Sequence, residues 1–339
     1  MLRRLPVYFL LDCSESMAGE PLDSVTTGLF KTVATLKKDP HALETVYVSF
    51  ISFATKAKLI APLTEVSEVE PPTLALRPGT SLGAALDLLR ERLQKEVVHT
   101  TKETKGDWRP LVFILTDGQP TDDWRKALND LRSVKPSLAH IYAFGCGDEV
   151  DFETLAQIAD VSFQVQALTQ DSLAKLFVWL TASIQKSVVS PDMALTLEKT
   201  LPKDMNLRLI DRDKPPKFQN LRPLLYIHGI CLKEKGHFLL KFRFSSQRGF
   251  YLFEKSDLLP EDFFEDGAMK SPPVEAEMIP SEIDCPYCHN SGWGKCGFCG
   301  HIFCLNLENP PPELTCPFCQ SRLRLAESEG SFSIDGSVG

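Results

Sequence analysis

The sequence lacks any apolar run that approaches the roughly 20 residues of a membrane-spanning helix. It also lacks an excess of positive charge, because 37 Lys and Arg stand against 45 Asp and Glu, for a net charge of −8. Nucleic acids and anionic membranes bind basic surfaces, so neither is expected as the main partner. The first 17 residues are apolar only over positions 5–11 and contain no small-residue cleavage site, so we predict a cytoplasmic protein.

Common catalytic motifs are missing as well. The chain has no G-x-S-x-G, no P-loop and, among its seven histidines, no H-E-x-x-H. Hydrolases of the haloacid-dehalogenase type have an aspartate at the end of a strand and a second acid two residues later, where this chain has Ser14. We therefore predict a protein that is not an enzyme, and a metal-dependent hydrolase remains an alternative.

Strand-like and helix-like segments alternate from residue 5 to about residue 187. Runs such as "PVYFLL", "RPLVFILT" and "AHIYAFG" are almost continuously apolar, as in parallel strands that are covered on both faces. The alternation predicts an α/β fold with a doubly wound, mainly parallel sheet for residues 1–189. Ligands of such sheets bind beyond the carboxyl ends of the strands.

The rest of the chain shows a different pattern of apolar and polar residues. Short strand-like runs separated by turns such as "KEKG" predict a β-rich region at residues 190–260. An acidic, proline-bearing linker is expected at 261–284, and a zinc-binding module of the zinc-ribbon or RING-like type at 285–325. Residues 326–339 have too little apolar content to fold alone and form a predicted flexible tail, whose serines 328, 331, 333 and 337 are candidate phosphorylation sites.

Oxygen-bearing side chains follow the ends of predicted strands. Asp12, Ser14 and Ser16 form a D-x-S-x-S pattern directly after the first apolar run. Thr80 lies in a turn before a predicted helix, and Asp117 follows another apolar strand. All five offer hard oxygen atoms, which suit Mg²⁺, so one magnesium site is predicted where these segments converge.

Each of these patterns is weak alone, because Ser and Asp are common in turns and at helix N-caps. Three patterns in order, each after a strand or before a helix, favour the metal site over the alternative of ordinary turns. Asp122 and Asp123 are expected to be helix caps rather than ligands.

The series D-x-S-x-S, G-T-S and T-D-G resembles the metal-ion-dependent adhesion site of von Willebrand factor A domains. The resemblance covers roughly residues 5–187. It implies that Ser14, Ser16 and Thr80 lie nearest the metal and that Asp12 and Asp117 act mainly through water. It also implies that a carboxylate from a protein partner completes the metal's coordination.

The ten cysteines are unevenly distributed. Cys13, Cys146 and Cys231 are scattered, whereas seven lie between residues 285 and 319, mostly as C-x-x-C pairs. In a cytoplasmic chain such clustering indicates metal binding rather than disulfides. Seven thiols and one imidazole are enough for two tetrahedral Zn²⁺ ions. The predicted ligands are Cys285, Cys288, Cys296, Cys299, His301, Cys304, Cys316 and Cys319.

The preferred pairing is interleaved, as a resemblance to the RING-like register implies. One ion is expected on Cys299, His301, Cys316 and Cys319, and the other on Cys285, Cys288, Cys296 and Cys304. A single-zinc ribbon is the alternative, and His289 is a substitute ligand in either case. "CGHIFC" followed by "CPFC" resembles a RING finger, but the cysteine needed near Leu307 is missing. A ubiquitin ligase with the A-type domain as substrate receptor is therefore kept only as an alternative.

The combination of an A-type domain with a C-terminal cysteine-rich module resembles the TerY family of bacterial tellurium-resistance proteins. That resemblance implies a cytoplasmic stress-response role, often beside a protein kinase and a metal-dependent Ser/Thr phosphatase. We predict a scaffold in which the A-type domain binds an acidic side chain of a partner through Mg²⁺ and the zinc module docks a second surface.

Overall fold

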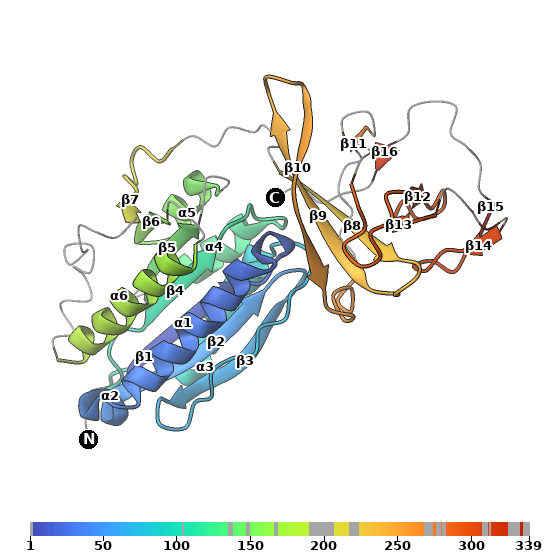
Figure 1. The fold of residues 1–339 in the computed structure, drawn as a ribbon. Helices are drawn as coiled ribbons and strands as arrows, with labels where there is room; N and C mark the ends of the chain where they lie inside the picture. Colours follow the sequence, from blue (N-terminus) through green and yellow to red (C-terminus); the bar gives the residue numbers. More distant parts are fainter. Residues whose placement is uncertain are drawn as a thin grey trace. The chain divides into compact units, whose positions relative to one another are not determined.

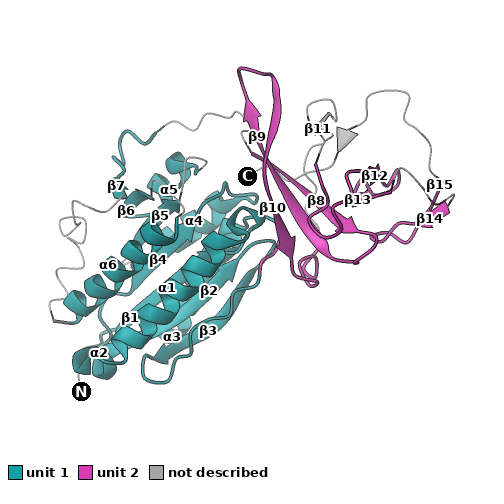
Figure 2. Ribbon diagram, in the orientation of Figure 1, with its two compact units in different colours: residues 1–75, 79–219 teal, residues 76–78, 220–339 magenta. Residues whose placement is uncertain are grey.

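The computed structural model describes residues 3–103, 105–134, 138–146, 150–165, 169–189, 207–216, 224–267, 274–275, 279, 283–306, 311, 313–324 and 333–334. The chain divides into two compact units, drawn as ribbons in Figure 1 and coloured separately in Figure 2. Unit 1 comprises Met1–Ala75 and Gly79–Gln219, and unit 2 comprises Leu76–Pro78 and Asn220–Gly339.

Unit 1 contains a seven-stranded sheet in the order β3-β2-β1-β4-β5-β6-β7. The five central strands are parallel, and β3 and β7 are antiparallel edge strands. The predicted α/β fold with a mostly parallel sheet is thereby confirmed. The strands are β1 (Leu5–Asp12), β2 (Val46–Phe53), β3 (Ala57–Glu65), β4 (Leu111–Thr116), β5 (His140–Cys146), β6 (Val161–Val165) and β7 (Leu207–Leu209).

Helices cover both faces of this sheet (Figure 1). One face carries Tyr8 and Leu10 and packs on α3, α4 and α5. The other face carries a row of rings that begins at Phe50 and ends at Trp179 of α6. The short helix η1 is Glu15–Met17; the others are α1 (Glu20–Leu36), α2 (Pro40–Thr45), α3 (Leu82–Glu96), α4 (Trp124–Ser133), α5 (Phe152–Ile158) and α6 (Gln170–Val189).

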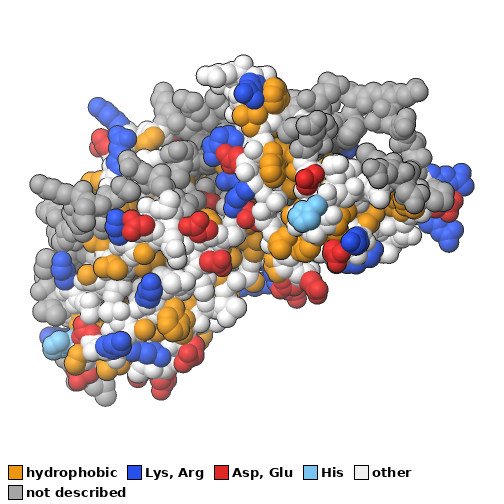
Figure 3. All heavy atoms as spheres, in the orientation of Figure 1, with side chains coloured by type: hydrophobic (Ala, Val, Ile, Leu, Met, Phe, Trp, Pro, Cys, Tyr) orange, Lys and Arg blue, Asp and Glu red, His pale blue; other side chains and the backbone are white. Residues whose placement is uncertain are grey.

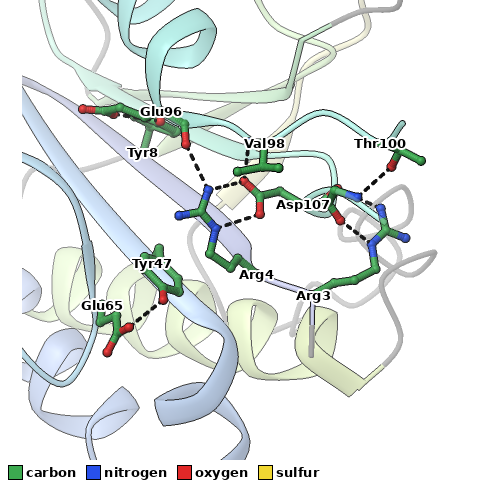
Figure 4. A network of polar contacts seen from close by, with 10 residues as sticks. Arg3, Arg4, Tyr8, Tyr47, Glu65, Glu96, Val98, Thr100 and Asp107 are labelled. Carbon is green, nitrogen blue, oxygen red and sulfur yellow. Dashed lines mark hydrogen bonds and ion pairs between the residues drawn. The ribbon is translucent and has the colours of Figure 1, made fainter. Parts of the chain in front are cut away.

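A polar network fastens the amino end of β1 (Figure 4). The Arg4 guanidinium donates to both carboxylate oxygens of Asp107, at 2.7 and 2.6 Å, and Asp107 also accepts from the Val98 N–H at 2.8 Å. Arg3 donates to the carbonyl oxygen of Asp107 at 2.7 Å. Burial of the phenol and its contact with Glu96 raise the pKa of Tyr8. This network lies at the amino end of β1, whereas Asp12 lies at the carboxyl end. It therefore does not account for the polar residues that begin at Asp12.

Unit 2 is built on a five-stranded sheet in the order β10-β9-β8-β13-β12. Its centre is the pairing of β8 with β13, which run parallel. The sheet strands are β8 (Leu224–Cys231), β9 (His237–Ser245), β10 (Phe250–Leu259), β12 (Trp293–Lys295) and β13 (Ile302–Cys304). Two further pairs are β14 (Glu313–Thr315) with β15 (Arg322–Arg324), and β11 (Val274–Glu275) with β16 (Ser333–Ile334).

The boundaries of unit 2 differ from those expected from the sequence. The pairing of β8 with β13 joins the predicted β-rich region and the predicted zinc module into one sheet. Part of the predicted linker is packed, since Phe263 is fully buried with its ring 5.2 Å from that of His228. Residues 207–209 pair with β6 and therefore belong to unit 1. Of the predicted tail, only residues 333–334 are among those described.

Residues 76–78 are the only part of the loop between β3 and α3 that belongs to unit 2. The Arg77 side chain is only 6% exposed and donates to Asp262 at 2.5 Å and to Glu265 at 3.0 Å.

Over the described part of the face shown in Figure 3, acidic and basic side chains are interspersed. This agrees with a chain that carries charges of both signs and a moderate net charge of −8.

Candidate metal centres

The first candidate centre lies where β1 and β4 end. These strands are parallel neighbours with Leu11 opposite Leu115, so the residues that follow them lie side by side. The Ser16 hydroxyl donates to the Asp117 carboxylate at 2.5 Å and lies 2.9 Å from the Ser14 hydroxyl. Two of the three sequence patterns are therefore in direct contact, although about 100 residues separate them.

The surroundings of Gly118 show that the G-T-S pattern, which contains Thr80, lies beside the other two patterns. A Cβ atom added to Gly118 would lie 3.2 Å from Thr80 Oγ1, 3.7 Å from Ser16 Oγ and 3.9 Å from Asp12 Oδ2. One small space beside Gly118 of the T-D-G pattern is thus bordered by oxygen atoms from the other two patterns. The structure brings the five predicted residues together at this point, which we name the oxygen cluster: Asp12, Ser14, Ser16, Thr80 and Asp117.

The geometry of the oxygen cluster fits Mg²⁺. An octahedral ion with ligands at about 2.1 Å places neighbouring ligand oxygens about 3.0 Å apart. The Ser14 and Ser16 hydroxyl oxygens are 2.9 Å apart, which is the spacing of two adjacent ligands. Carboxylates stand beside these hydroxyls, since Asp117 accepts from Ser16 and Asp12 accepts from the Ser14 N–H at 2.9 Å.

The electrostatics of the oxygen cluster also favour a cation. Asp12 is 1% exposed, and burial raises its pKa to about 6 despite hydrogen bonds from Ser14 and Thr116 that act in the opposite direction. The charge of Glu15, another buried carboxylate, contributes to the same rise. A bound cation would relieve this concentration of negative charge.

Three further residues support the oxygen cluster, and sequence reasoning missed them. Thr116 donates to the Asp12 carboxylate at 2.5 Å, and Thr121 accepts from the Thr80 N–H at 3.0 Å. Glu15 accepts from the Gly79 N–H at 2.5 Å. All three occur inside or beside the quoted patterns, but their partners lie on other loops, so local spacing gives no signal for these contacts.

The predicted role of the two neighbouring aspartates is confirmed. The Asp122 carboxylate accepts from the N–H groups of Gly83 and Ala84, both at 2.9 Å, at the start of α3. Asp123 is the N-cap of α4 and accepts from the Arg125 N–H. Both carboxylates satisfy helix N-termini, as capping residues do.

Eight cysteine sulfurs form two further candidate centres, both in unit 2. Within each, the sulfur atoms all lie within 4.8 Å of one another. A tetrahedral Zn²⁺ with sulfur ligands at about 2.3 Å requires sulfurs about 3.8 Å apart. The recorded separations are 3.6 Å for Cys288–Cys304 and Cys231–Cys304, 3.6 Å for Cys296–Cys319 and 3.7 Å for Cys299–Cys316. Sulfur group 1 is Cys231, Cys285, Cys288 and Cys304; sulfur group 2 is Cys296, Cys299, Cys316 and Cys319.

These groups correct the expected ligand set and pairing. His301 is in neither group; its ring stacks on that of Phe318 with centroids 4.1 Å apart. Cys231, expected to be an isolated cysteine, takes part in group 1 because the pairing of β8 with β13 sets it directly opposite Cys304. Cys296 consequently belongs with group 2. His289, the substitute ligand, is likewise outside both groups.

One turn geometry occurs four times around these sulfurs. In each case the cysteine C=O accepts from the N–H four residues later, and the cysteine N–H donates to the C=O five residues later, over 2.8–3.0 Å. The fourth residue after the cysteine has a positive φ: 60° at Lys235, 58° at His289, 76° at Gly300 and 60° at Gln320. Lys235, His289 and Gln320 are the only non-glycine residues with a positive φ among the described residues. The turns are residues 231–236, 285–290, 296–301 and 316–321.

The two sulfur groups are two versions of one arrangement. Each combines two such turns, and the aromatic residue two positions after the second turn's cysteine packs on the last residue of the first turn. Thus Tyr287 packs against Gly236, where a Cβ would lie 2.1 Å from its ring, and Phe318 packs against His301. Glu234 occupies the position of the second cysteine in the first turn of group 1, and Cys304 supplies the missing sulfur instead.

The surroundings of the thiols suit zinc. Burial raises the pKa of Cys285 and Cys316, and backbone N–H groups of the residues that follow oppose this by donating to the sulfurs. Such donors stabilise thiolates, the form that binds metal. Four thiols packed this closely are stable together as thiolates only around a cation.

Comparison with known proteins agrees with the fold of unit 1. The model of the von Willebrand factor type A domain family matches residues 7–177, half of the chain. The chain therefore belongs to the von Willebrand factor type A domain family, and its C-terminal part contains two four-cysteine groups that could hold metal.

Solved structures with a similar fold are distant in sequence. Proximal thread matrix protein 1 from the mussel byssus is 18% identical, with a TM-score of 0.38, and the match covers 53% of this chain and 47% of that one. Another structure of that protein has a zinc-occupied MIDAS motif, with 17% identity and a TM-score of 0.40 over 53% of this chain and 47% of that one. A von Willebrand factor type A protein from Catenulispora acidiphila is 18% identical, with a TM-score of 0.37 over 53% of this chain and 42% of that one.

These matches span less than half the length of the solved chains. Among the described residues, no helix has both the length and the apolar character needed to cross a bilayer.

Proposed function

We propose that this protein is a metal-dependent protein-binding scaffold that carries out no reaction of its own. Its oxygen cluster holds one Mg²⁺, and the open side of that ion binds a carboxylate from a partner protein. The observation that carries this proposal is the space beside Gly118, bordered at 3.2–3.9 Å by oxygens of Thr80, Ser16 and Asp12.

The donor set explains why a carboxylate would be preferred. Hydroxyl ligands are neutral and leave most of the charge of a divalent cation uncompensated. Such a site binds the metal more tightly once an anionic oxygen from outside completes the coordination. Metal and partner should therefore raise each other's affinity by the same factor.

The two sulfur groups have a different part in this scaffold. Each supplies four sulfur donors at tetrahedral spacing, so we propose two structural Zn²⁺ ions that hold unit 2 together. The completed unit offers the second docking surface. A RING-type ubiquitin ligase is not favoured, because the histidine that a RING register would use stacks on Phe318 outside both groups.

The cellular setting is proposed from architecture alone. The chain combines a von Willebrand factor type A domain with two four-cysteine groups that could hold metal. This combination resembles the TerY-type proteins. We therefore propose a cytoplasmic stress-response role with a protein kinase and a metal-dependent Ser/Thr phosphatase as partners. Three of the four candidate phosphorylation sites in the tail, Ser328, Ser331 and Ser337, lie outside the described residues.

The test is capture of partners from the cell of origin by the full-length protein, with Mg²⁺ present or omitted, followed by calorimetry with the captured partner. Omitting Mg²⁺, rather than adding a chelator, leaves zinc in place. We expect Asp117→Ala to remove the Mg²⁺-dependent part of the affinity, and Asp123→Ala, which removes only a helix cap, to retain it. Equal affinity with and without Mg²⁺ in the wild type would show that the oxygen cluster is not the binding surface.

A further inference from the structure

Glu15 is a buried carboxylate that lies between the two serines of the D-x-S-x-S pattern. Its residue is only 5% exposed, although it is in a short helix at the end of a strand, where acidic side chains usually face water. Its carboxylate accepts from the Gly79 N–H at 2.5 Å. Gly79 is 64 residues away in sequence and directly precedes the predicted ligand Thr80.

This contact helps to fix the position of Thr80. Gly79 has a φ of 81°, which a residue with a side chain would rarely adopt, so the backbone here is sharply bent. The Thr80 N–H donates to the Thr121 hydroxyl at 3.0 Å, and the Thr80 carbonyl accepts from the Thr121 N–H at 2.9 Å. The loop that presents Thr80 is thus held from two directions: by Glu15 beside the Ser14 and Ser16 ligands, and by Thr121 from the loop after β4.

Glu15 also brings charge. Asp12, Glu15 and Asp117 are 1%, 5% and 6% exposed, so three carboxylates are buried around the oxygen cluster. Like charges that are buried together repel each other strongly, because water cannot screen them there. A divalent cation among them would turn this repulsion into attraction.

We propose that Glu15 is a positioning residue of the magnesium site, which sets the place of Thr80 through Gly79 and supplies negative charge that makes the metal-free site unfavourable. This inference rests on the proposed function of the oxygen cluster. It assigns to Glu15 a role that the five oxygen-cluster residues do not cover, because Glu15 acts through the Gly79 backbone.

Two substitutions separate the two contributions of Glu15. Glu15→Gln keeps an oxygen that can accept from the Gly79 N–H but removes the charge. Glu15→Ala removes both the acceptor and the charge. Glu44→Ala, on the exposed face of α2, removes an acidic residue of the same unit without touching the oxygen cluster and is the matched control.

The experiment uses the zinc-loaded full-length protein and Mg²⁺ alone as the probe. Binding is measured by calorimetric titration, and the unfolding midpoint of unit 1 is recorded with and without Mg²⁺. Loss of a residue that orients metal ligands typically costs about 10- to 100-fold in metal affinity. We expect Glu15→Gln to weaken Mg²⁺ binding about tenfold, within that range, and Glu15→Ala to weaken it more.

The unfolding midpoint without Mg²⁺ distinguishes a residue that contributes charge to the metal site from one that only holds the loop in place. We expect Glu15→Gln to raise the Mg²⁺-free midpoint, because repulsion falls, while the shift caused by Mg²⁺ becomes smaller. A structural clamp alone would lower the midpoint and leave the Mg²⁺ shift unchanged, and that result overturns the inference. Wild-type Mg²⁺ affinity in both variants overturns it as well, and Glu15→Gln decides the matter if Glu15→Ala fails to fold. Absence of Mg²⁺ binding in the wild type overturns the proposed function, and this inference with it.

Discussion

The two units differ in where their candidate metal ligands stand relative to the apolar core. In unit 1 the oxygen cluster follows strands whose side chains already pack into a continuous core with α3, α4 and α5. In unit 2 five of the eight candidate sulfur ligands are themselves core residues: Cys231, Cys285 and Cys304 belong to one apolar cluster, and Cys296 and Cys316 to another. A metal at a sheet rim can be added or lost by a folded protein, whereas a metal inside the core is part of the fold.

The sizes of the elements strengthen this contrast. Around sulfur group 2 the strands β12, β13, β14 and β15 are three residues long, too short to bury a self-sufficient core. In unit 1, by contrast, rows of buried aromatic rings cross the sheet from Phe50 to Phe163. Mg²⁺ should therefore affect what unit 1 binds, and Zn²⁺ should affect whether unit 2 folds.

The largest expected effect comes from Cys231→Ser. This change removes one sulfur from group 1, so we expect the zinc content to fall from two ions to one per chain and β8, β13 and the turn at 285–290 to lose their fixed structure. A structural zinc ion contributes on the order of 10 kcal/mol to folding at neutral pH. Elemental analysis and the unfolding transition of unit 2 are the measurements.

Two variants serve as controls for Cys231→Ser. Cys146→Ser replaces a buried cysteine of β5 that belongs to neither sulfur group, and His301→Ala removes the histidine expected from the sequence to be a ligand. Both should retain two zinc ions. Two ions in Cys231→Ser, or one in His301→Ala, would contradict the assignment of group 1 or of group 2, respectively.

Cys231, which the sequence did not identify as a ligand, and His301, which it did, show which ligands can be predicted from sequence patterns. The C-x-x-C pairs are local patterns, so six of the eight sulfur ligands could be recognised as pairs. Cys231 stands 54 residues before Cys285, and the second position of its turn is Glu234, so its spacing carries no metal signal. Only the pairing of β8 with β13 brings it to Cys304. The repeated turn could have been suspected from "KEKG", which does predict a turn after Cys231.

Unit 1 was more predictable for a physical reason. Continuous apolar runs identify buried parallel strands, and the polar residues that end them must meet at one edge of the sheet. That reasoning placed Asp12 and Asp117 together. It did not foresee β3, an edge strand that is exposed at alternate residues and contains Pro62, nor the contact of Glu15 with Gly79, which depends on how two loops fold over each other.

A middle-sized effect is expected from Gly118→Ala. Its new methyl group would lie 3.2 Å from Thr80 Oγ1 and inside the space assigned to Mg²⁺. We expect Mg²⁺ affinity to fall about tenfold, as for other disturbances of ligand geometry, with a change in unfolding free energy below about 1 kcal/mol. Titration calorimetry with Mg²⁺ checks it, and undiminished affinity would show that the ion does not occupy this space.

The smallest expected effect concerns the turns of unit 2. Gly300 has a φ of 76°, so Gly300→Ala should lower the stability of unit 2 by about 1–2 kcal/mol. Gly297→Ala, three residues away, would place its methyl group where nothing lies within 4 Å and should cost less. Both should keep two zinc ions, and thermal unfolding of the two variants measures the difference. An equal cost for both would mean that the turn geometry does not limit stability.

The contrast between the units is tested most directly by scanning calorimetry of the full-length protein before zinc removal, after zinc removal, and after addition of Mg²⁺. We predict two transitions in the zinc-loaded protein. Removal of zinc should abolish the transition of unit 2 and leave that of unit 1 in place, and Mg²⁺ should raise only the transition of unit 1. Survival of the unit 2 transition without zinc, or loss of the unit 1 transition with it, would contradict the assignment of one metal to binding and the other to folding.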